Sequence, residues 1–409
     1  MESSPGTGEE AARRRQLRLR PHRSLVVNVM LLALGLLIAV TVISLVKLWP
    51  EGPIARSSAV VSTRTFGALV KRISEQSCTT SLNGRCRIVT ATIRDGRDKG
   101  RTTRFEITPA PGLGALRPGD AIRVIRNPPP PPGATVKLPA YSFADFDRRG
   151  PMLWLGLGFV VLLLASGRLH GLRALLGLGA SLVLVLKFVV PAILKGHSAV
   201  AVALTGSLTV LLITIPLSYG IRAKAIAAWL GTALSLFLAV GLASAFTHLA
   251  HLSGAYSEQA AFLSASGVHI SLRGLLLGGM VIGALGVLID LTVSQASTVI
   301  ALRRANPALQ FKGLFTGALE VGHDHIAATV NTLVFAYAGA SLPVLLIFSI
   351  GGTSLTDAVN SEPVAVEVIA SLVGSVGLIA SMPITTALAA LLATRMSDKQ
   401  LAVEHAHVH

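Results

Sequence analysis

Long apolar runs with very few charged residues follow one another along most of the chain. The runs lie at residues 25–46, 151–167, 172–194, 198–219, 223–248, 274–298, 326–349 and 365–394. A helix rises about 1.5 Å per residue, so about 17–25 apolar residues are enough to cross the hydrocarbon core of a bilayer. The pattern therefore predicts an all-α polytopic membrane bundle with about eight transmembrane helices.

Residues 50–130 have a different pattern, in which apolar and polar residues alternate. The alternating segments are 87–93, 105–107 and 121–125, and Arg117-Pro118-Gly119-Asp120 is a turn sequence between them. Alternation with a period of two, bounded by turns, is typical of short strands. We therefore expect a small β-rich domain, followed over residues 131–150 by a proline-rich linker and an amphipathic lead-in to the membrane.

The remaining segments complete the predicted domain organisation. Residues 1–24 contain six arginines and are expected to form a disordered basic arm. Residues 25–47 are longer than the apolar region of a signal peptide and lack a small-x-small cleavage site, so they predict an uncleaved transmembrane anchor. Residues 151–395 form the predicted seven-helix membrane domain, and residues 396–409 form a tail that contains histidines.

Composition supports a membrane location and argues against a nucleic-acid partner. Charged residues make up 14% of the chain and hydrophobic residues 52%, whereas soluble domains are about a quarter charged. The formal net charge is +16, but the basic residues lie in the N-terminal arm, in short loops and in the β-rich segment rather than on one folded face. The expected partners are the lipid bilayer and a small ion or solute. Oligomeric state is not indicated.

Basic residues gather in alternate loops, which predicts the orientation of the chain in the membrane. One set of loops holds Arg168, Arg173, Arg222, Lys224, Arg303, Arg304, Lys312, Arg395 and Lys399, on the same side as the N-terminal arm. The short loops of the other side hold little beyond Lys195 and Arg273. Cytoplasmic loops are the ones enriched in Lys and Arg. Both termini are therefore expected on the cytoplasmic side of the cell membrane, and the β-rich domain is expected on the outer side.

The two cysteines, Cys78 and Cys86, lie in the predicted extracytoplasmic domain, where thiols can oxidise. The dipeptide Asn83-Gly84 between them is a hairpin turn sequence. We favour a disulfide over two free thiols. Closing so short a loop stabilises by roughly 2 kcal/mol in the chain-entropy model.

Three sequence blocks in the last third of the chain carry a family resemblance. They are GALGVLIDLTVSQAS at 283–297, GHDHIAATVNTL at 322–333 with AYAGASLP at 336–343, and Glu362-Pro363, Glu367, GSVGL at 374–378 and PITT at 383–386. With these blocks, residues from about 140 to 395 resemble the YibE/F-like membrane proteins. The resemblance implies a fold and a membrane location rather than an activity.

The clearest candidate for chemistry is Asp290, an acid inside a predicted span. Such a group costs about 2.5–3.5 kcal/mol on insertion scales, so it marks a functional or packing site. Helical spacing places it on one face of its helix, with Gly279, Gly283, Gly286, Ser294 and Ser297. In the last span, Pro383 removes a backbone donor and can break the helix.

Two interpretations of Asp290 remain open. One is an ion or substrate site in the cytoplasmic half, formed by Asp290, Ser294, Asn331 and Thr385 and bordered by Asp324. The other is a contact between helices, in which Asp290 is hydrogen-bonded to Asn331 or a threonine.

Further ionisable groups are weaker candidates. His323 and His325 flank Asp324 and are weak metal-ligand candidates, with Glu320 three residues before His323. A second cluster in the tail, His405, His407 and His409, is as easily incidental. On the other side, Glu258, Glu362 and Glu367 either attract cations or are ordinary loop and helix N-terminal charges. No nucleotide-binding, zinc-protease or serine-hydrolase motif is present, and no cofactor is expected.

The sequence favours a secondary transporter or permease of a small solute or ion, with Asp290 as the coupling or binding group. The alternative is a non-transporting envelope factor whose β-rich domain binds a partner or a wall ligand. A membrane-embedded enzyme is a third possibility. It requires a second catalytic group at the depth of Asp290, and Ile289 does not supply one.

Overall fold

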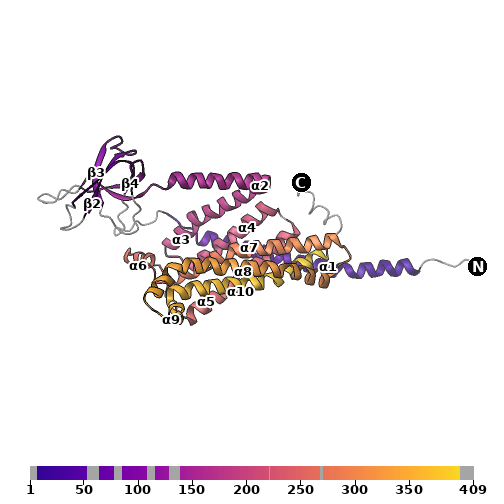
Figure 1. Ribbon diagram of the computed structural model, residues 1–409. Coiled ribbons are helices and arrows are strands. Elements are labelled where there is room, and N and C mark those ends of the chain that lie inside the picture. The colour runs from indigo at the N-terminus through magenta and orange to yellow at the C-terminus, as the bar shows by residue number, and fades with distance from the viewer. Residues whose placement is uncertain are drawn as a thin grey trace, which may run out of the picture. The chain divides into compact units, whose positions relative to one another are not determined.

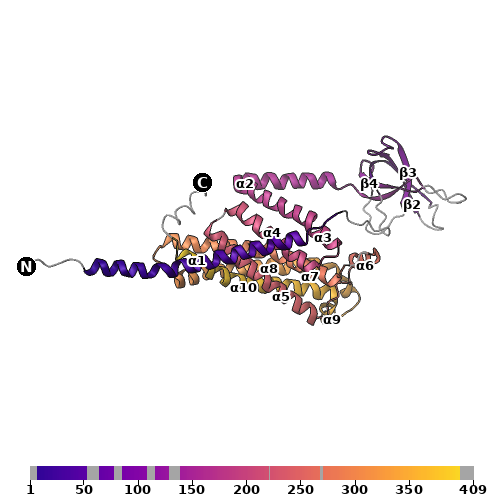
Figure 2. The same ribbon diagram turned by 180° about the vertical axis from the view of Figure 1, so that it is seen from behind.

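The structure is a computed structural model that describes residues 7–52, 64–77, 85–107, 116–128, 139–220, 222–267 and 270–396. It divides into two compact units, a helical unit of residues 1–57 and 169–409 and a smaller unit of residues 58–168. The helices are α1 (Thr7–Lys47), α2 (Arg149–Leu184), the π-helix η1 (Val185–Val189), α3 (Val190–Leu194), α4 (Ala199–Tyr219), α5 (Ala223–Leu249), α6 (Glu258–Ala265), α7 (Leu272–Ala305), α8 (Phe311–Ile350), α9 (Leu355–Asn360) and α10 (Glu362–Ala393) (Figures 1 and 2).

Seven helical segments among the described residues are long and apolar enough to cross a membrane. Six of them match single predicted runs, while the seventh, Arg149–Leu194, contains the two runs 151–167 and 172–194. The backbone leaves helical geometry at Arg168, where φ is 46° and ψ is −123°. The structure thus has seven candidate spans, and an eighth crossing depends on whether Arg149–Leu194 crosses once or twice.

Several helices extend beyond the predicted runs. The N-terminal arm was expected to be disordered, but α1 begins at Thr7, and the Arg, Leu, Glu and Ala of this segment are good helix formers. α7 ends at Ala305 rather than residue 298, and α8 begins at Phe311 rather than residue 326. The extra turns contain polar residues, so hydropathy alone places the helix ends too close to the apolar centre.

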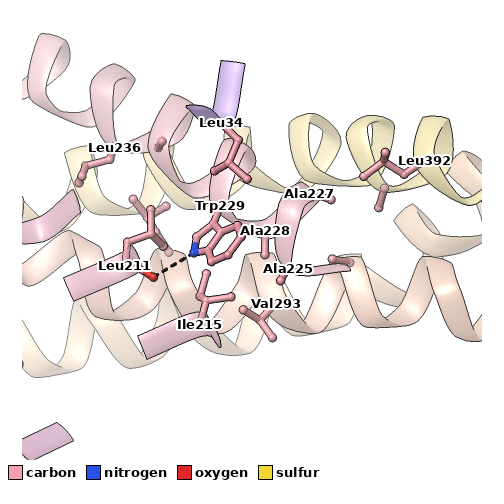
Figure 3. Close-up of a cluster of buried hydrophobic side chains, with 14 of the residues drawn as sticks. Leu34, Leu211, Ile215, Ala225, Ala227, Ala228, Trp229, Leu236, Val293 and Leu392 are labelled. Carbon is pink, nitrogen blue, oxygen red and sulfur yellow. Dashed lines mark hydrogen bonds between the residues drawn. The ribbon is translucent and has the colours of Figure 1, made fainter. Parts of the chain in front are cut away.

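Three helices, α5, α7 and α10, all contact one another and form the centre of the bundle. Around them, α4 packs against α7, and α8 packs against α7 and α10. α1 packs against α4 and α5. Trp229 of α5 is buried in this core, and its indole Nε1 donates to the backbone oxygen of Leu211 in α4 over 3.1 Å (Figure 3). Leu34, Ile215 and Val293 belong to the same buried cluster. A buried indole therefore joins apolar packing to a hydrogen bond between two helices.

Close contact between α5 and α10 depends on Gly231. A β carbon at this position would lie 2.1 Å from Oγ1 of Thr385 and 3.2 Å from its α carbon. Nearby, the hydroxyls of Thr232 and Thr292 are 2.6 Å apart and join α5 to α7. Small residues and buried hydroxyls hold the three helices together, as expected where water does not drive helix association.

Pro383 does not break its helix, because α10 continues from Glu362 to Ala393. The sequence-based expectation of a break is therefore wrong. Pro383 removes the backbone donor to the carbonyl of Ile379 alone, and transmembrane helices tolerate such a proline. The nearby hydroxyls of Ser381 and Thr386 donate to the carbonyls of Leu378 and Met382.

The smaller unit contains one curled five-stranded sheet. Its strands are β1 (Thr65–Ser77), β2 (Arg85–Ile93), β3 (Thr102–Ile107), β4 (Ala121–Arg126) and β5 (Tyr141–Phe146), in the order β3-β2-β1-β4-β5, with antiparallel neighbours throughout. β3 also contacts β5. The long first strand pairs with both β2 and β4, as in five-stranded Greek-key barrels of the OB type.

The domain boundary at residue 130 needs correction, because β5 lies in the segment predicted to be a lead-in to the membrane. Tyr141 is buried in the sheet core, and Val124 of β4 pairs with Phe143 of β5. The β-rich domain was predicted from β2, β3 and β4, and these three strands are confirmed.

Of the two cysteines, Cys86 is buried and disulfide-bonded, while Cys78 lies outside the described residues, so the pairing stays a prediction.

Candidate functional site

Asp290 lies in the middle of α7, on a face that the chain leaves open. By helical rise it is roughly 27 Å from Leu272 and roughly 22 Å from Ala305. Its side chain is 73% exposed, and Oδ2 lies 3.9 Å from Nε2 of His325 on α8. This Nε2 atom is itself buried and makes no hydrogen bond among the described residues. The carboxylate therefore has one basic neighbour and otherwise faces outward.

A groove between α7 and α8 lies beside this pair, and His325 lines it while Asp290 does not. Its volume is about 420 Å³, and it is lined by Ser294, Gln295, Thr298, Val321, Gly322, Asp324, His325 and Ala328. Hydroxyl, amide, carboxylate and imidazole groups thus meet along two neighbouring helices. Such a set can bind a cation or exchange a proton.

The structure brings together only some of the predicted site residues. Ser294 and Asp324 line the groove. Asn331 is exposed on α8 but does not line the groove, and no hydrogen bond joins it to Asp290 among the described residues. Thr385 is fully buried against Gly231, between α10 and α5. The position that Asn331 was expected to take beside Asp290 is occupied by His325.

The shared face predicted for α7 is largely open. Gly279, Gly283, Gly286, Asp290 and Ser294 are all exposed. A β carbon added at Gly279 or Gly286 would have no neighbour within 4 Å. Within the described chain these two glycines therefore do not serve close helix packing.

Gln295, to which no role was assigned from sequence, makes polar contacts with two other helices. It is 2% exposed, and its Nε2 donates to the backbone oxygen of Ala318 over 2.7 Å and to Oγ1 of Thr386 over 2.8 Å. One amide thus joins α7 to α8 and α10. In the sequence, the signal for this contact role was a polar, uncharged glutamine inside an apolar run.

The metal candidates gain no support in the part of the chain that the structure describes. There, no group of three or more His, Cys, Asp or Glu side chains lies close enough to hold a metal ion. His323 is exposed and does not line the groove. His405, His407 and His409 lie outside the described residues.

The three glutamates at the other end of the bundle have different surroundings. Glu362 accepts hydrogen bonds from the backbone nitrogens of Ser253 and Gly254, at 2.5 and 2.7 Å, so it fastens the loop before α6 to the start of α10. Glu258 is exposed in the first turn of α6. Glu367 is half-buried and lines a separate pocket of about 300 Å³.

These helices correspond to a recognised protein family. A model for YibE/F-like proteins matches residues 155–395, more than half of the chain. The chain belongs to the YibE/F-like family. The resemblance seen in the three sequence blocks is thereby confirmed. The match covers the candidate spans from α2 to α10, but neither α1 nor the five-stranded sheet of this YibE/F-like protein. Neither a curated protein nor a solved structure matches the chain.

Proposed function

We propose that this YibE/F-like protein is a permease for a small ion or solute, with Asp290 as the group that binds the transported species or a coupling cation. The observation that carries the proposal is the exposed carboxylate of Asp290, which lies 3.9 Å from Nε2 of His325, a residue that lines the α7–α8 groove. Asp290 is too far from either end of α7 for its short side chain to reach the membrane surface.

The energy of an exposed acid favours a wet groove over a lipid-facing surface. An ionised carboxylate among acyl chains costs about 2.5–3.5 kcal/mol or more. Water or a bound cation at the carboxylate removes that cost. A partner helix that covers Asp290 also removes it, so the two explanations need a functional test.

Currents on a solid-supported membrane provide this test. The purified full-length chain, reconstituted in proteoliposomes, is challenged with jumps in Na⁺, K⁺, ammonium or pH. We expect the wild type to give transport currents and Asp290→Asn to give currents that are about 10- to 100-fold smaller. The reason is that an interaction with an ionised group is worth about 1.5–3 kcal/mol. The matched control is Glu320→Gln, the same change of charge on an exposed residue of α8 outside the groove. Wild-type currents in Asp290→Asn would exclude the proposed role.

We further propose that Arg149–Leu194 crosses the membrane twice, which makes eight crossings with both termini in the cytoplasm. At about 1.5 Å per residue, 46 residues are about twice as long as the hydrocarbon core requires. The non-helical backbone at Arg168 and the basic residue Arg173 mark the turn. Lys99→Cys, in the sheet unit, should react with an impermeant maleimide in intact cells. Reaction only after lysis contradicts this topology.

A second candidate function is ligand binding by the five-stranded unit. Its pocket of about 500 Å³ is lined by Arg64, Thr65, Phe66, Asp95, Gly96, Arg97, Asp98, Arg126 and Tyr141. Both aspartates already have partners, since Asp95 pairs with Arg123 and Asp98 with Arg101. The three lining arginines therefore suit a phosphate- or carboxylate-bearing ligand.

Arginine substitution separates the two candidates better than deletion of residues 55–130, which would remove the partners of β5. In a permease, alanine at Arg64, Arg97 and Arg126 leaves the proteoliposome currents intact. In an envelope factor, the same variant loses binding of an anionic polymer such as polyphosphate, and Asp290→Asn does not.

A further inference from the structure

The pocket at the α6 end of the bundle has a composition distinct from that of the α7–α8 groove. It lies between the α5–α6 loop, α6, α7, α8 and α10, and α6 and α9 lie at the same end in both views (Figures 1 and 2). Most of its lining is apolar, including Leu263, Leu275, Leu276, Met280 and Val366. Its volume of about 300 Å³ is within the range of small-ligand sites.

A single carboxylate, that of Glu367, lies in this apolar lining. Glu367 is half-buried, and among the described residues it forms no ion pair. Glu362, five residues earlier in α10, is in contrast hydrogen-bonded to Ser253 and Gly254. Glu367 is therefore the negative charge of this pocket that has no counter-charge in the described chain.

Two tyrosines from different elements line the pocket with Glu367. Tyr256 precedes α6 and Tyr337 belongs to α8. Tyr337 reaches α7, because a β carbon added at Gly283 would lie 3.2 Å from its hydroxyl. Burial, and then the negative charges of Glu367 and Glu362, raises the pKa of Tyr256, so its phenol stays neutral beside these carboxylates. Neutral aromatic rings beside an acid form a favourable site for a cation.

We propose that this pocket binds a small organic cation, with its ammonium group between Glu367, Tyr256 and Tyr337 and its carbon groups against the leucines. Glu367 excludes anions. The apolar walls disfavour a bare inorganic ion, because they cannot replace its hydration shell. The same walls gain by covering alkyl groups.

The position of the pocket on α7 suggests that its ligand is also the transported species. Gly279 lines the pocket and precedes Asp290 by roughly 16 Å of helix, on the same open face. This link to transport rests on the proposed function, whereas binding to the pocket does not.

Equilibrium dialysis of radiolabelled tetramethylammonium against the full-length chain in nanodiscs tests the inference. We expect saturable binding that weakens about 10- to 100-fold in Glu367→Gln, from loss of a charged partner. Tyr337→Leu should weaken binding about 3- to 30-fold, and Tyr337→Phe should leave it within about twofold, because the ring rather than the hydroxyl faces the cation. Glu258→Gln, an equal change of charge at the same end but outside the pocket, is the matched control.

Competition and folding controls make each outcome decisive. Potassium, sodium and the neutral tert-butanol should not displace the probe. Displacement by potassium or sodium at equal concentration overturns the organic-cation assignment, as does equal loss in Glu258→Gln and Glu367→Gln. Absence of saturable binding overturns the site. If Glu367→Gln does not elute as a monodisperse species, the Tyr337→Phe and Tyr337→Leu pair decides.

Asp290→Asn distinguishes this inference from the proposed function. It should bind tetramethylammonium like the wild type while its currents are lost. If the wild-type chain binds tetramethylammonium but gives no currents, the permease proposal alone is contradicted. If the wild-type chain gives currents but does not bind tetramethylammonium, the pocket assignment alone is contradicted.

Discussion

Oδ2 of Asp290 and Nε2 of His325 lie 3.9 Å apart and connect the middle of α7 to α8. The distance is that of an ion pair rather than a hydrogen bond, and the attraction requires a protonated imidazole. The two helices therefore share a polar contact beside a groove that both of them line.

A double-mutant cycle should detect this contact. We predict that Asp290→Asn and His325→Gln each lower the thermal stability of the purified chain. The double variant should fall short of additivity by about 0.5–1 kcal/mol, which is the usual value of a partly exposed pair. Glu320→Gln with His325→Gln should be additive, and coupling there of equal size would contradict the assignment.

Gly231→Ala should destabilise the bundle, since its new methyl group would lie 2.1 Å from Oγ1 of Thr385 and close to the backbone of α10. Overpacking of this kind costs about 1–3 kcal/mol. The control is Gly241→Ala in the same helix, where no atom lies within 4 Å, and where alanine is the better helix former by up to about 1 kcal/mol. Thermal unfolding of both variants, followed by tryptophan fluorescence, should give shifts of opposite sign. Adding Thr385→Ala should recover part of the loss.

Gln295→Leu should weaken the junction of α7, α8 and α10. The substitution removes the donor to Ala318 and Thr386 in a buried site, so we expect a loss of about 1–3 kcal/mol. Ser294→Ala, one residue away on the open face, should change stability by less than about 0.5 kcal/mol. Equal shifts for the two variants in the unfolding temperature would refute the contact role of Gln295.

Local patterns predicted most of the fold. The apolar runs gave the long helices, and two-residue alternation gave β2, β3 and β4. β1 and β5 were missed for two reasons. β1 contains Gly67 and Lys71-Arg72, which weaken its alternation, and β5 pairs with a strand on the far side of a proline-rich segment. Pairing across such a separation has no local signal.

The sequence was less informative about the candidate site. Helical spacing placed Asp290 and Ser294 on one face, and both are exposed on α7. The sequence-based interpretation paired Asp290 with Asn331 instead of His325. One reason is that α8 was expected to begin at residue 326. The other is that residue spacing does not determine which face of α8 is turned toward α7. Thr385 was assigned by depth alone, yet depth does not distinguish the α5 side of α10 from the groove.

The hydrogen bond between Tyr141 and Asp98 in the five-stranded unit should make the stability of that unit dependent on acid pH. The hydroxyl of Tyr141 donates to Oδ2 of Asp98 over 2.5 Å. This bond, together with the positive charges of Arg126 and Arg101, lowers the pKa of Asp98 below its ordinary 3.8. A lowered pKa in the folded state means that ionised Asp98 stabilises the fold above that ordinary value, and that this stabilisation is lost as the pH falls through the folded-state pKa.

Tyr141→Phe removes the hydrogen bond that contributes most to the lowered pKa of Asp98. The destabilising effect of this substitution should therefore be largest near neutral pH and should shrink as the pH falls below about 3.8. Hydrogen exchange of peptides from β1 and β5 in the full-length chain, corrected for intrinsic exchange rates, measures the difference. In an Asp98→Asn background the effect of Tyr141→Phe should not vary with pH, because no carboxyl remains to titrate at that position. A pH-independent effect in the wild-type background would instead mean that Tyr141 acts through packing in the sheet core alone, since the loss of a buried ring contact does not depend on the charge of its neighbour.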